Sequence, residues 1–282
     1  MVAAAHRRVA DRAVAGRAAA EAGAHRRGYR GVKDARFKVS PLKLRVYLAC
    51  PLRYRYQYID RLPPRLRPHD TVGTAVHFVL QQFFRLPVEE RTPECLLALF
   101  DQRWASLSPR YRRMPGAEEL QQRARRQLEA FAAREDLRAR PLLLEPYLEV
   151  ALAPDVVLFG RPDRVDEEPD GSLHVIDYKT GEPPEEVDAA QLRLYAIMVQ
   201  KGLGRPVSRA SFWYLEGGQV WTAAVTAEAL AQAEAEAVAL AREMQGAASF
   251  PGRVGPHCAR CPFLYACQHR EEIAQRRQAE RW

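Results

Sequence analysis

Two short, largely apolar runs with turn residues between them constrain the fold of this chain most strongly. Residues 156–159 (VVLF) end at Gly160, and residues 173–176 (LHVI) follow the turn-forming sequence Pro-Asp-Gly at 169–171. Runs of this length, bounded by glycine and proline, are typical of buried β-strands. We therefore expect the two runs to form a hairpin, with Asp163 near its tight end.

A second acid and a lysine follow the second run, in Asp177-Tyr178-Lys179. Side chains along a strand alternate between its two faces, so Asp177 and Lys179 point the same way, while Tyr178 points oppositely and offers its carbonyl. Together with Asp163 they can bring two carboxylates and an ammonium together. Such oxygen ligands suit Mg²⁺ or Mn²⁺, and a lysine beside the metal can steady a nucleophilic water or the charge on a phosphate. The pattern suggests metal-assisted phosphodiester hydrolysis, although such residues at strand ends are more often solvated surface groups.

The charge of the whole chain favours polyanionic partners. Its 282 residues include 43 Lys and Arg against 35 Asp and Glu, a formal net charge of +8, and nucleic acid is the first candidate partner. The arginine- and alanine-rich composition of a GC-rich genome is the alternative explanation. No stretch approaches the ~20 uncharged apolar residues of a membrane span, and no secretory signal is present. We therefore expect a soluble, cytoplasmic protein.

The first 35 residues differ in composition from the rest. Residues 1–35 are rich in alanine, arginine and glycine and lack large apolar residues, so we expect a disordered or poorly ordered basic arm. Contact with nucleic acid, organelle targeting and a start codon placed too far upstream are further interpretations, and the last or plain disorder is favoured. Residues 36–282 are expected to form one domain.

Helical and strand patterns alternate along that domain. Ser40 can cap a helix that begins at Pro41. A proline-rich linker at 63–68 precedes a largely buried helix from Thr71, and many arginines accompany the next two helical patterns. The later elements expected are helices at 93–107, 117–138, 188–201 and 226–246, and strands at 210–215 and around 220–222. This order predicts an α/β core with a helical insertion at about 90–140.

Four residues elsewhere in the sequence are candidates to join the acids and the lysine. Gln191 and Tyr195 lie four apart on one helix face and can hydrogen-bond a phosphate or a metal-bound water. The alternative is that Tyr195 packs and Gln191 faces solvent. His77 lies in an apolar helical run, where a histidine is more often a core residue than a metal ligand. Glu145 begins a strand-like run and is interpreted as a structural or outer acid rather than a ligand.

Taken in order, these motifs resemble those of the RecB-type PD-(D/E)xK nucleases, from about residue 40 to 270. The motifs are Gly73-Thr-Ala-Val-His77, Glu145, Gly160-Arg-Pro-Asp163-Arg-Val-Asp166, Asp177-Tyr-Lys179-Thr-Gly181 and Gln191-Leu-Arg-Leu-Tyr195. The resemblance implies a restriction-endonuclease-like core, with a central mixed β-sheet flanked by helices.

The same resemblance implies a role for each motif residue. The metal, Mg²⁺ or Mn²⁺, would be bound by His77, Asp163, Asp177 and the carbonyl of Tyr178. Lys179 would be the catalytic cation. The residues implied to be catalytic are Lys179, Asp163, Asp177, Gln191 and Tyr195.

Four of the five cysteines point to a second metal site. Cys258, Cys261 and Cys267 are grouped, and Cys50 stands far upstream. Such grouping in an intracellular protein favours a metal over disulfides. Spacing alone leaves Zn²⁺ and an iron–sulfur cluster equally open, and His257 or His269 could replace a thiolate. The fifth cysteine, Cys95, lies among leucines and is expected to be an ordinary buried thiol.

One cysteine before the nuclease motifs and three after them resemble the iron–sulfur RecB-type nucleases. These include the AddB nuclease domain and the fourth CRISPR-associated protein family. The resemblance implies a [4Fe–4S] cluster on Cys50, Cys258, Cys261 and Cys267, with Zn²⁺ as the less favoured metal. The cluster would be a clasp that joins the N-terminal helix to a segment at about 250–270.

The sequence thus predicts a metal-dependent DNA exonuclease that acts on single-stranded ends. Its role would be DNA repair and recombination or the trimming of CRISPR prespacers in antiviral defence, and its candidate protein partners are a helicase and a CRISPR integrase. The alternative is a non-catalytic iron–sulfur DNA-binding scaffold with vestigial nuclease motifs. Arginines interleaved with tyrosines at 53–58, and further arginines at 103–113 and 123–126, could bind a single strand or be packed and solvated.

Overall fold

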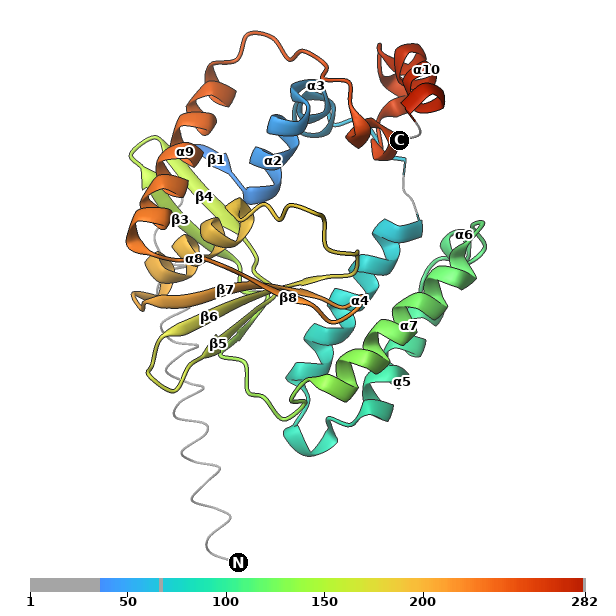
Figure 1. The fold of residues 1–282 in the computed structure, drawn as a ribbon, viewed down its shortest axis with the longest axis vertical. Helices are drawn as coiled ribbons and strands as arrows, with labels where there is room; N and C mark the ends of the chain where they lie inside the picture. Colours follow the sequence, from blue (N-terminus) through green and yellow to red (C-terminus); the bar gives the residue numbers. More distant parts are fainter. Residues whose placement is uncertain (1–35, 66–67, 281–282) are drawn as a thin grey trace, which may run out of the picture. The chain divides into compact units, whose positions relative to one another are not determined.

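Two β-sheets organise the chain in the computed structural model, which describes residues 36–65 and 68–280 (Figure 1). The compact unit to which they belong begins at Phe37. The basic arm expected at residues 1–35 lies outside the described residues. The α/β class predicted from the sequence is confirmed, with the strands divided between two sheets.

The smaller sheet has the strand order β1-β4-β3. Its strands are β1 (Phe37–Val39), β3 (Leu148–Ala153) and β4 (Val156–Gly160). β4 is its central strand, because it pairs parallel to β1 and antiparallel to β3. The hairpin predicted between 156–159 and 173–176 is therefore wrong, since β4 has no partner there. Pro162, which has no N–H for a ladder, lies in the break where the chain passes to the other sheet.

The larger sheet is mixed and has the order β2-β5-β6-β7-β8. Its strands are β2 (Leu143–Leu144), β5 (Arg164–Glu167), β6 (Leu173–Lys179), β7 (Val207–Tyr214) and β8 (Val220–Ala223). β6 pairs parallel to β7, and the other neighbours are antiparallel. β6 is buried along nearly its whole length because it is the central strand. The parallel pair requires a crossover, and helix α8 (Ala190–Leu203) provides it.

One hydrophobic core joins the two sheets to helices α2, α8 and α9. α2 spans Pro41–Ala49 and α9 spans Ala227–Gly246. The cap predicted for α2 is confirmed, because the Ser40 side chain accepts a hydrogen bond from the backbone N–H of Lys43 at 3.2 Å. After α2 the chain continues in α3 (Pro51–Tyr54) and in η1 (Arg55–Ile59).

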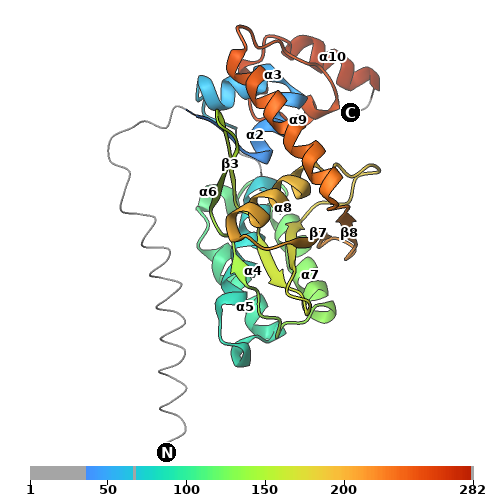
Figure 2. The same ribbon diagram turned by 90° about the vertical axis from the view of Figure 1, so that its left-hand side faces the viewer.

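A second core lies between the larger sheet and helices α4, α5 and α7. Figure 2 shows these helices away from α9 and α10, towards the lower end of the view. The elements are α4 (Pro68–Arg85), η2 (Val88–Glu90), α5 (Pro93–Ala105), α6 (Pro109–Arg112) and α7 (Ala117–Arg134). Ile176 and Tyr178 of β6 belong to this core. α7 ends four residues before its predicted end because Glu135 adopts an extended backbone.

The C-terminal segment lies against the segment that follows α2. It comprises η3 (Pro256–Arg260), η4 (Leu264–Ala266) and α10 (Arg270–Glu280). The Tyr56 hydroxyl donates to the carbonyl of Ala266 at 3.0 Å, and the Tyr265 hydroxyl donates to that of Pro63 at 2.7 Å. Segments about two hundred residues apart are thus joined by direct hydrogen bonds. No helix among the described residues is long and apolar enough to cross a membrane.

Candidate functional site

Asp163 lies at the break between β4 and β5, where its carboxylate is held from two sides. Its Oδ2 accepts a hydrogen bond from the backbone N–H of Tyr178 at 2.7 Å, and its Oδ1 lies 3.1 Å from Nδ1 of His77. β6 and α4 thus meet at this side chain. Asp163 was expected near the tight end of a hairpin, but these two contacts position it instead.

Asp177 and Lys179 share one face of β6, as the alternation of strand side chains predicts. The Lys179 ammonium contacts Oδ2 of Asp177 at 2.5 Å. The Tyr178 ring points to the opposite face, where its centroid lies 5.8 Å from that of Phe131 and 6.0 Å from that of Trp213. Only 5% of the Asp177 side chain is exposed, against 27% for Lys179, so the acid is internal while the ammonium reaches solvent.

Gln191 of α8 bridges the acid and the lysine. Its Oε1 accepts from the Lys179 ammonium at 3.2 Å, and its Nε2 donates to Oδ1 of Asp177 at 3.2 Å. The same Nε2 lies 3.4 Å from the Tyr195 hydroxyl, one helical turn further on. Gln191 therefore belongs to the site instead of facing solvent. Burial raises the pKa of the Tyr195 phenol, as does the charge of Asp177, so the hydroxyl stays protonated.

Gly160 allows α8 to approach the end of β4. A Cβ at this position would lie 2.8 Å from Cε of Met198 and 3.2 Å from Cε1 of Tyr195. A Cβ here would force the terminal methyl of Met198 to move and would press on the ring of Tyr195. The glycine at the start of the Gly160-Arg-Pro-Asp163 motif is thus explained by packing.

His77 belongs to the site and is not an isolated core histidine. Burial opposes the charged imidazole, but the hydrogen bond to Asp163 and the nearby carboxylates outweigh it and raise the pKa of His77. Gly73, one turn earlier on α4, lies beside Thr180, because a Cβ there would lie 3.4 Å from Oγ1 of Thr180, which is an ordinary van der Waals contact. The sequence placed this histidine correctly only through the family resemblance.

The two neighbouring carboxylates repel each other, so a cation between them would stabilise both in their ionised form. Burial and the charge of Asp163 raise the pKa of Asp177 to about 6, although Lys179 and His77 favour its ionised form. Two carboxylates beside an imidazole form a donor set that suits Mg²⁺ or Mn²⁺. The residues present therefore fit a divalent cation in their chemistry.

The donors of this site are paired with one another. His77 contacts Asp163, and Asp177 contacts Lys179. Across residues 36–65 and 68–280, no three His, Cys, Asp or Glu side chains converge on a point that could hold a metal ion. Cation binding at this site would exchange these paired contacts for coordination, and the predicted ligand set stays a prediction.

A sequence profile identifies the family of this chain. The profile of the PD-(D/E)XK nuclease superfamily matches residues 38–268. The chain belongs to this superfamily. Members of the superfamily are typically nucleases, and the mixed α/β architecture fits the superfamily core.

Comparisons with individual proteins do not define the function of this chain further. A search of curated proteins gave no match. Among solved structures, the chain is similar to one titled "Crystal structure of SSO0001", with 14% sequence identity and a TM-score of 0.42. That similarity covers 85% of this chain and 88% of the other.

Glu145 borders the candidate site, where its carboxyl interacts electrostatically with Asp163 and His77. Its backbone is left-handed, with a φ of 47°, and its N–H donates to the carbonyl of Asp163 at 2.9 Å. Burial raises the pKa of its carboxyl, and the charge of Asp163 raises it further. A non-glycine residue in this conformation is uncommon and is often found at functional sites. Its interpretation as an outer acid stays a prediction.

Gln127 of α7 is a site neighbour that the sequence analysis missed. Its side chain is buried, and its Nε2 donates to the carbonyl of Thr180 at 2.9 Å, directly after the lysine. The same Nε2 lies 2.5 Å from Oε2 of Glu216. A signal was present, because Gln127 follows Leu120 and Ala124 on the apolar face of an amphipathic helix.

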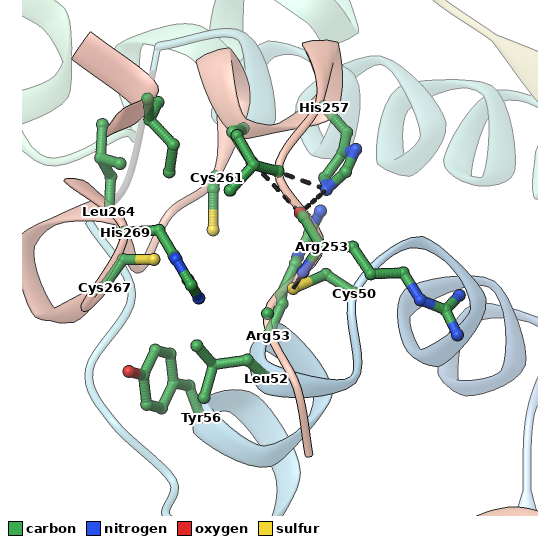
Figure 3. Close-up of a pocket in the computed structure, with 14 residues that line it drawn as sticks. Cys50, Leu52, Arg53, Tyr56, Arg253, His257, Cys261, Leu264, Cys267 and His269 are labelled. Carbon is green, nitrogen blue, oxygen red and sulfur yellow. Dashed lines mark hydrogen bonds between the residues drawn. The ribbon is translucent and has the colours of Figure 1, made fainter. Parts of the chain in front are cut away.

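The four predicted cluster cysteines line one pocket (Figure 3). Cys50 directly precedes α3, Cys258 lies in η3, and Cys261 and Cys267 directly follow η3 and η4. The Cys50 sulfur accepts from the backbone N–H of Arg253 at 3.5 Å, and none of the chain's cysteines forms a disulfide in the described structure. Burial raises the pKa values of Cys258, Cys261 and Cys267, and so do neighbouring thiols.

The tyrosines near this pocket are used in packing. Tyr54 is buried, with its ring centroid 5.5 Å from that of Tyr47 and 5.1 Å from that of Tyr58. Tyr56 donates its hydroxyl to the carbonyl of Ala266. The packing alternative therefore holds for these rings, and base stacking is not supported. Cys95 is half-buried rather than fully buried and packs at the edge of the second core.

Proposed function

We propose that this protein is a divalent-metal-dependent DNA nuclease, and specifically an exonuclease that acts on the ends of single-stranded DNA. The observation that supports the proposal most is the convergence of Asp163, Asp177 and Lys179 with His77, in a chain of a nuclease superfamily. Side chains from α4, the β4–β5 break and β6 meet there although they are distant in sequence.

The metal in this proposal is Mg²⁺ or Mn²⁺. His77, Asp163, Asp177 and the carbonyl of Tyr178 would hold it. When bound, the ion supplies a Lewis acid and lowers the pKa of a coordinated water. The two carboxylates would neutralise the charge of the cation. Burial disfavours an isolated negative charge on Asp177, so a bound cation would stabilise its ionised form.

Lys179 would stabilise the negative charge that develops on the phosphate. Its ammonium is held by Asp177 and by Oε1 of Gln191, and it lies 4.5 Å from the ring centroid of Phe212. These contacts limit the positions that the flexible side chain can take, so its charge is pre-organised for the transition state. Gln191 and Tyr195 would orient the substrate or the attacking water.

A cleavage assay tests the proposed activity. The wild-type protein with Mn²⁺ should degrade single-stranded DNA, and 5′- and 3′-labelled strands report polarity and strand preference. Lys179→Ala should reduce the rate about 10²–10³-fold. Lys201→Ala is the matched control, because Lys201 pairs with Glu234 on the surface of the same unit. Equal rates for wild type and Lys179→Ala would leave the non-catalytic scaffold as the better account.

The cysteine pocket supports a second part of the proposal, a structural [4Fe–4S] cluster on Cys50, Cys258, Cys261 and Cys267. All four thiols line the same pocket, which also contains His257 and His269. A cluster would give a brown protein with broad absorption near ~400 nm, whereas Zn²⁺ would be colourless. Iron, sulfide and zinc contents of anaerobically purified protein decide between them.

Two biological roles in the cytoplasm are proposed for this nuclease. One is DNA repair and recombination beside a helicase, and the other is the trimming of CRISPR prespacers beside an integrase in antiviral defence. The basic charge of the chain suits DNA in both settings. Co-purification with an integrase, and trimming of a prespacer to a defined length, would support the second.

A further inference from the structure

A groove of about 610 Å³ begins where the catalytic strand ends. Thr180 and Gly181, which directly follow Lys179, form part of its wall. Helix α7 contributes Leu120, Arg123, Ala124 and Gln127 on one side. The remaining lining residues are Arg53, Val72, Glu182 and Arg260. The groove therefore joins α3, α4, α7 and η3 next to the proposed catalytic cation.

The charge of the groove is positive. Three arginines face a single carboxylate, that of Glu182, among the described lining residues. Arg123 lies 3.3 Å from Glu182 and 2.9 Å from Glu216, so it offsets these acids. Among the described residues, neither Arg53 nor Arg260 forms an ion pair with a carboxylate, so both can pair with an anion in the groove. Arg53 also lines the cysteine pocket.

The wall of the groove is held in place. Gln127 links α7 to the carbonyl of Thr180, and Arg123 links the same helix to Glu182 and Glu216. Val72, Leu120 and Ala124 add apolar surface. A site with guanidinium groups beside an apolar wall can bind phosphates and the faces of sugars or bases at the same time.

We propose that this groove binds the segment of a single DNA strand next to the scissile phosphate, with Arg53 and Arg260 pairing with its phosphates. The proposal rests on the proposed nuclease function and adds where the strand binds and which residues hold it. Guanidinium groups match phosphate oxygens in a bidentate manner. A duplex turns its bases inward and leaves the apolar wall unused, whereas an unpaired strand exposes them.

Binding measured without cleavage tests this groove. Fluorescence anisotropy with a fluorescein-labelled 12-nucleotide single strand, without added divalent metal, reports affinity alone. Arg260→Ala and Arg53→Ala should each weaken binding roughly tenfold. Each should also lower the salt slope of log affinity by about 0.7. Arg260→Lys should keep most of the affinity, and the exposed Arg138→Ala, outside the groove, should bind as wild type.

A charge inserted at Gly181 gives a test that does not touch the arginines near the cysteine pocket. A Cβ at Gly181 would meet no atom within 4 Å, so a side chain fits without displacing a neighbour. Gly181→Glu should weaken binding about tenfold relative to Gly181→Gln, because the two side chains differ mainly in charge.

The outcomes separate the groove from the nuclease activity. If Arg260→Ala and Gly181→Glu bind the strand as tightly as their controls, the groove proposal is overturned, whatever the protein cleaves. A duplex of the same sequence that competes as well as the single strand overturns it too. If the wild type cleaves nothing while both variants still lose affinity, the groove stands and the nuclease proposal fails.

Discussion

The two proposed metal sites differ in how the protein holds their donors. At the end of β6, the acids, the lysine and the imidazole bind one another through a continuous network of polar contacts. In the cysteine pocket, the four thiols line a shared space and have few polar partners. The comparison teaches that polar contacts within the protein already position the proposed catalytic groups. In the cysteine pocket, hydrogen bonds from Tyr56 and Tyr265 already join the two segments, and the proposed cluster would add a further link between them.

The strongest test of this comparison removes one charge from the proposed catalytic network and keeps the shape of the side chain. Asp163→Asn keeps the side-chain volume but loses a carboxylate that the proposed metal requires. We expect the cleavage rate to fall on the order of 10³-fold, because a metal contributes several kcal/mol to catalysis. Circular dichroism and the melting temperature should stay close to wild type. An active Asp163→Asn enzyme would remove Asp163 from the site.

The opposite result is expected in the cysteine pocket, where a substitution should lower the stability of the fold more than the cleavage rate. Cys261→Ser should lower the melting temperature by about 10 °C, comparable to the loss of a structural cross-link. Calorimetry under anaerobic conditions measures it, and Cys95→Ser is the matched control because Cys95 lies outside the pocket. If both serine variants melt alike, no ligand clasps the two segments.

His174 lies on β6 outside the proposed catalytic network, and it tests whether the acid sensitivity of folding stability arises outside that network. Burial and the charge of Arg209 lower the pKa of His174 from 6.5 to about 4. The unfolded chain therefore binds a proton before the folded one does, and stability is lost as the pH falls from 6.5 to 4. The loss is at most about 3 kcal/mol.

His174→Gln should flatten that dependence. Gln can still hydrogen-bond Ser211, whose Oγ lies 2.9 Å from Nε2 of His174, but it does not titrate. Urea unfolding at pH 4, 5.5 and 7 compares the two proteins. An unchanged pH dependence in the variant would assign the acid sensitivity to other groups.

The smallest effect is expected at Gln127, which supports the catalytic strand from outside the network. Gln127→Leu keeps the buried volume but loses the bond to the carbonyl of Thr180. We expect a loss of about 1–2 kcal/mol in the free energy of unfolding. Cleavage should fall only severalfold, mainly through binding of the single strand. A loss as large as that of Asp163→Asn would make Gln127 part of the catalytic site.

Local elements of this fold could be read from the sequence to a large extent. Ser40 and Pro41 start α2 as predicted, since a cap depends on neighbours within one turn. The alternation along β6 puts Asp177 and Lys179 together, and the spacing of four puts Gln191 and Tyr195 on one helix face. These features follow from backbone geometry, which acts over a few residues.

Strand pairing could not be read in the same way. The run at 156–159 is as apolar as a hairpin partner of β6 would be, yet it pairs with β1 and β3 in a separate sheet. Apolar composition indicates burial but does not specify the partner. The left-handed backbone of Glu145 and the position of Gln127 beside Thr180 were not predicted for a related reason, because both depend on contacts from other elements.

The sequence by itself determined the chemistry that this protein can offer: acids and a lysine in strand alternation, a histidine and a glutamine on helices, and four cysteines at the two ends of the domain. Tertiary structure decided which of these groups meet. It joined α4, β6 and α8 around Asp163 and Asp177, and it opened an arginine-lined groove at Thr180 and Gly181. The physical reason is range, since dihedral preferences act between neighbours while burial and charge pairing act between segments that the chain must first bring together.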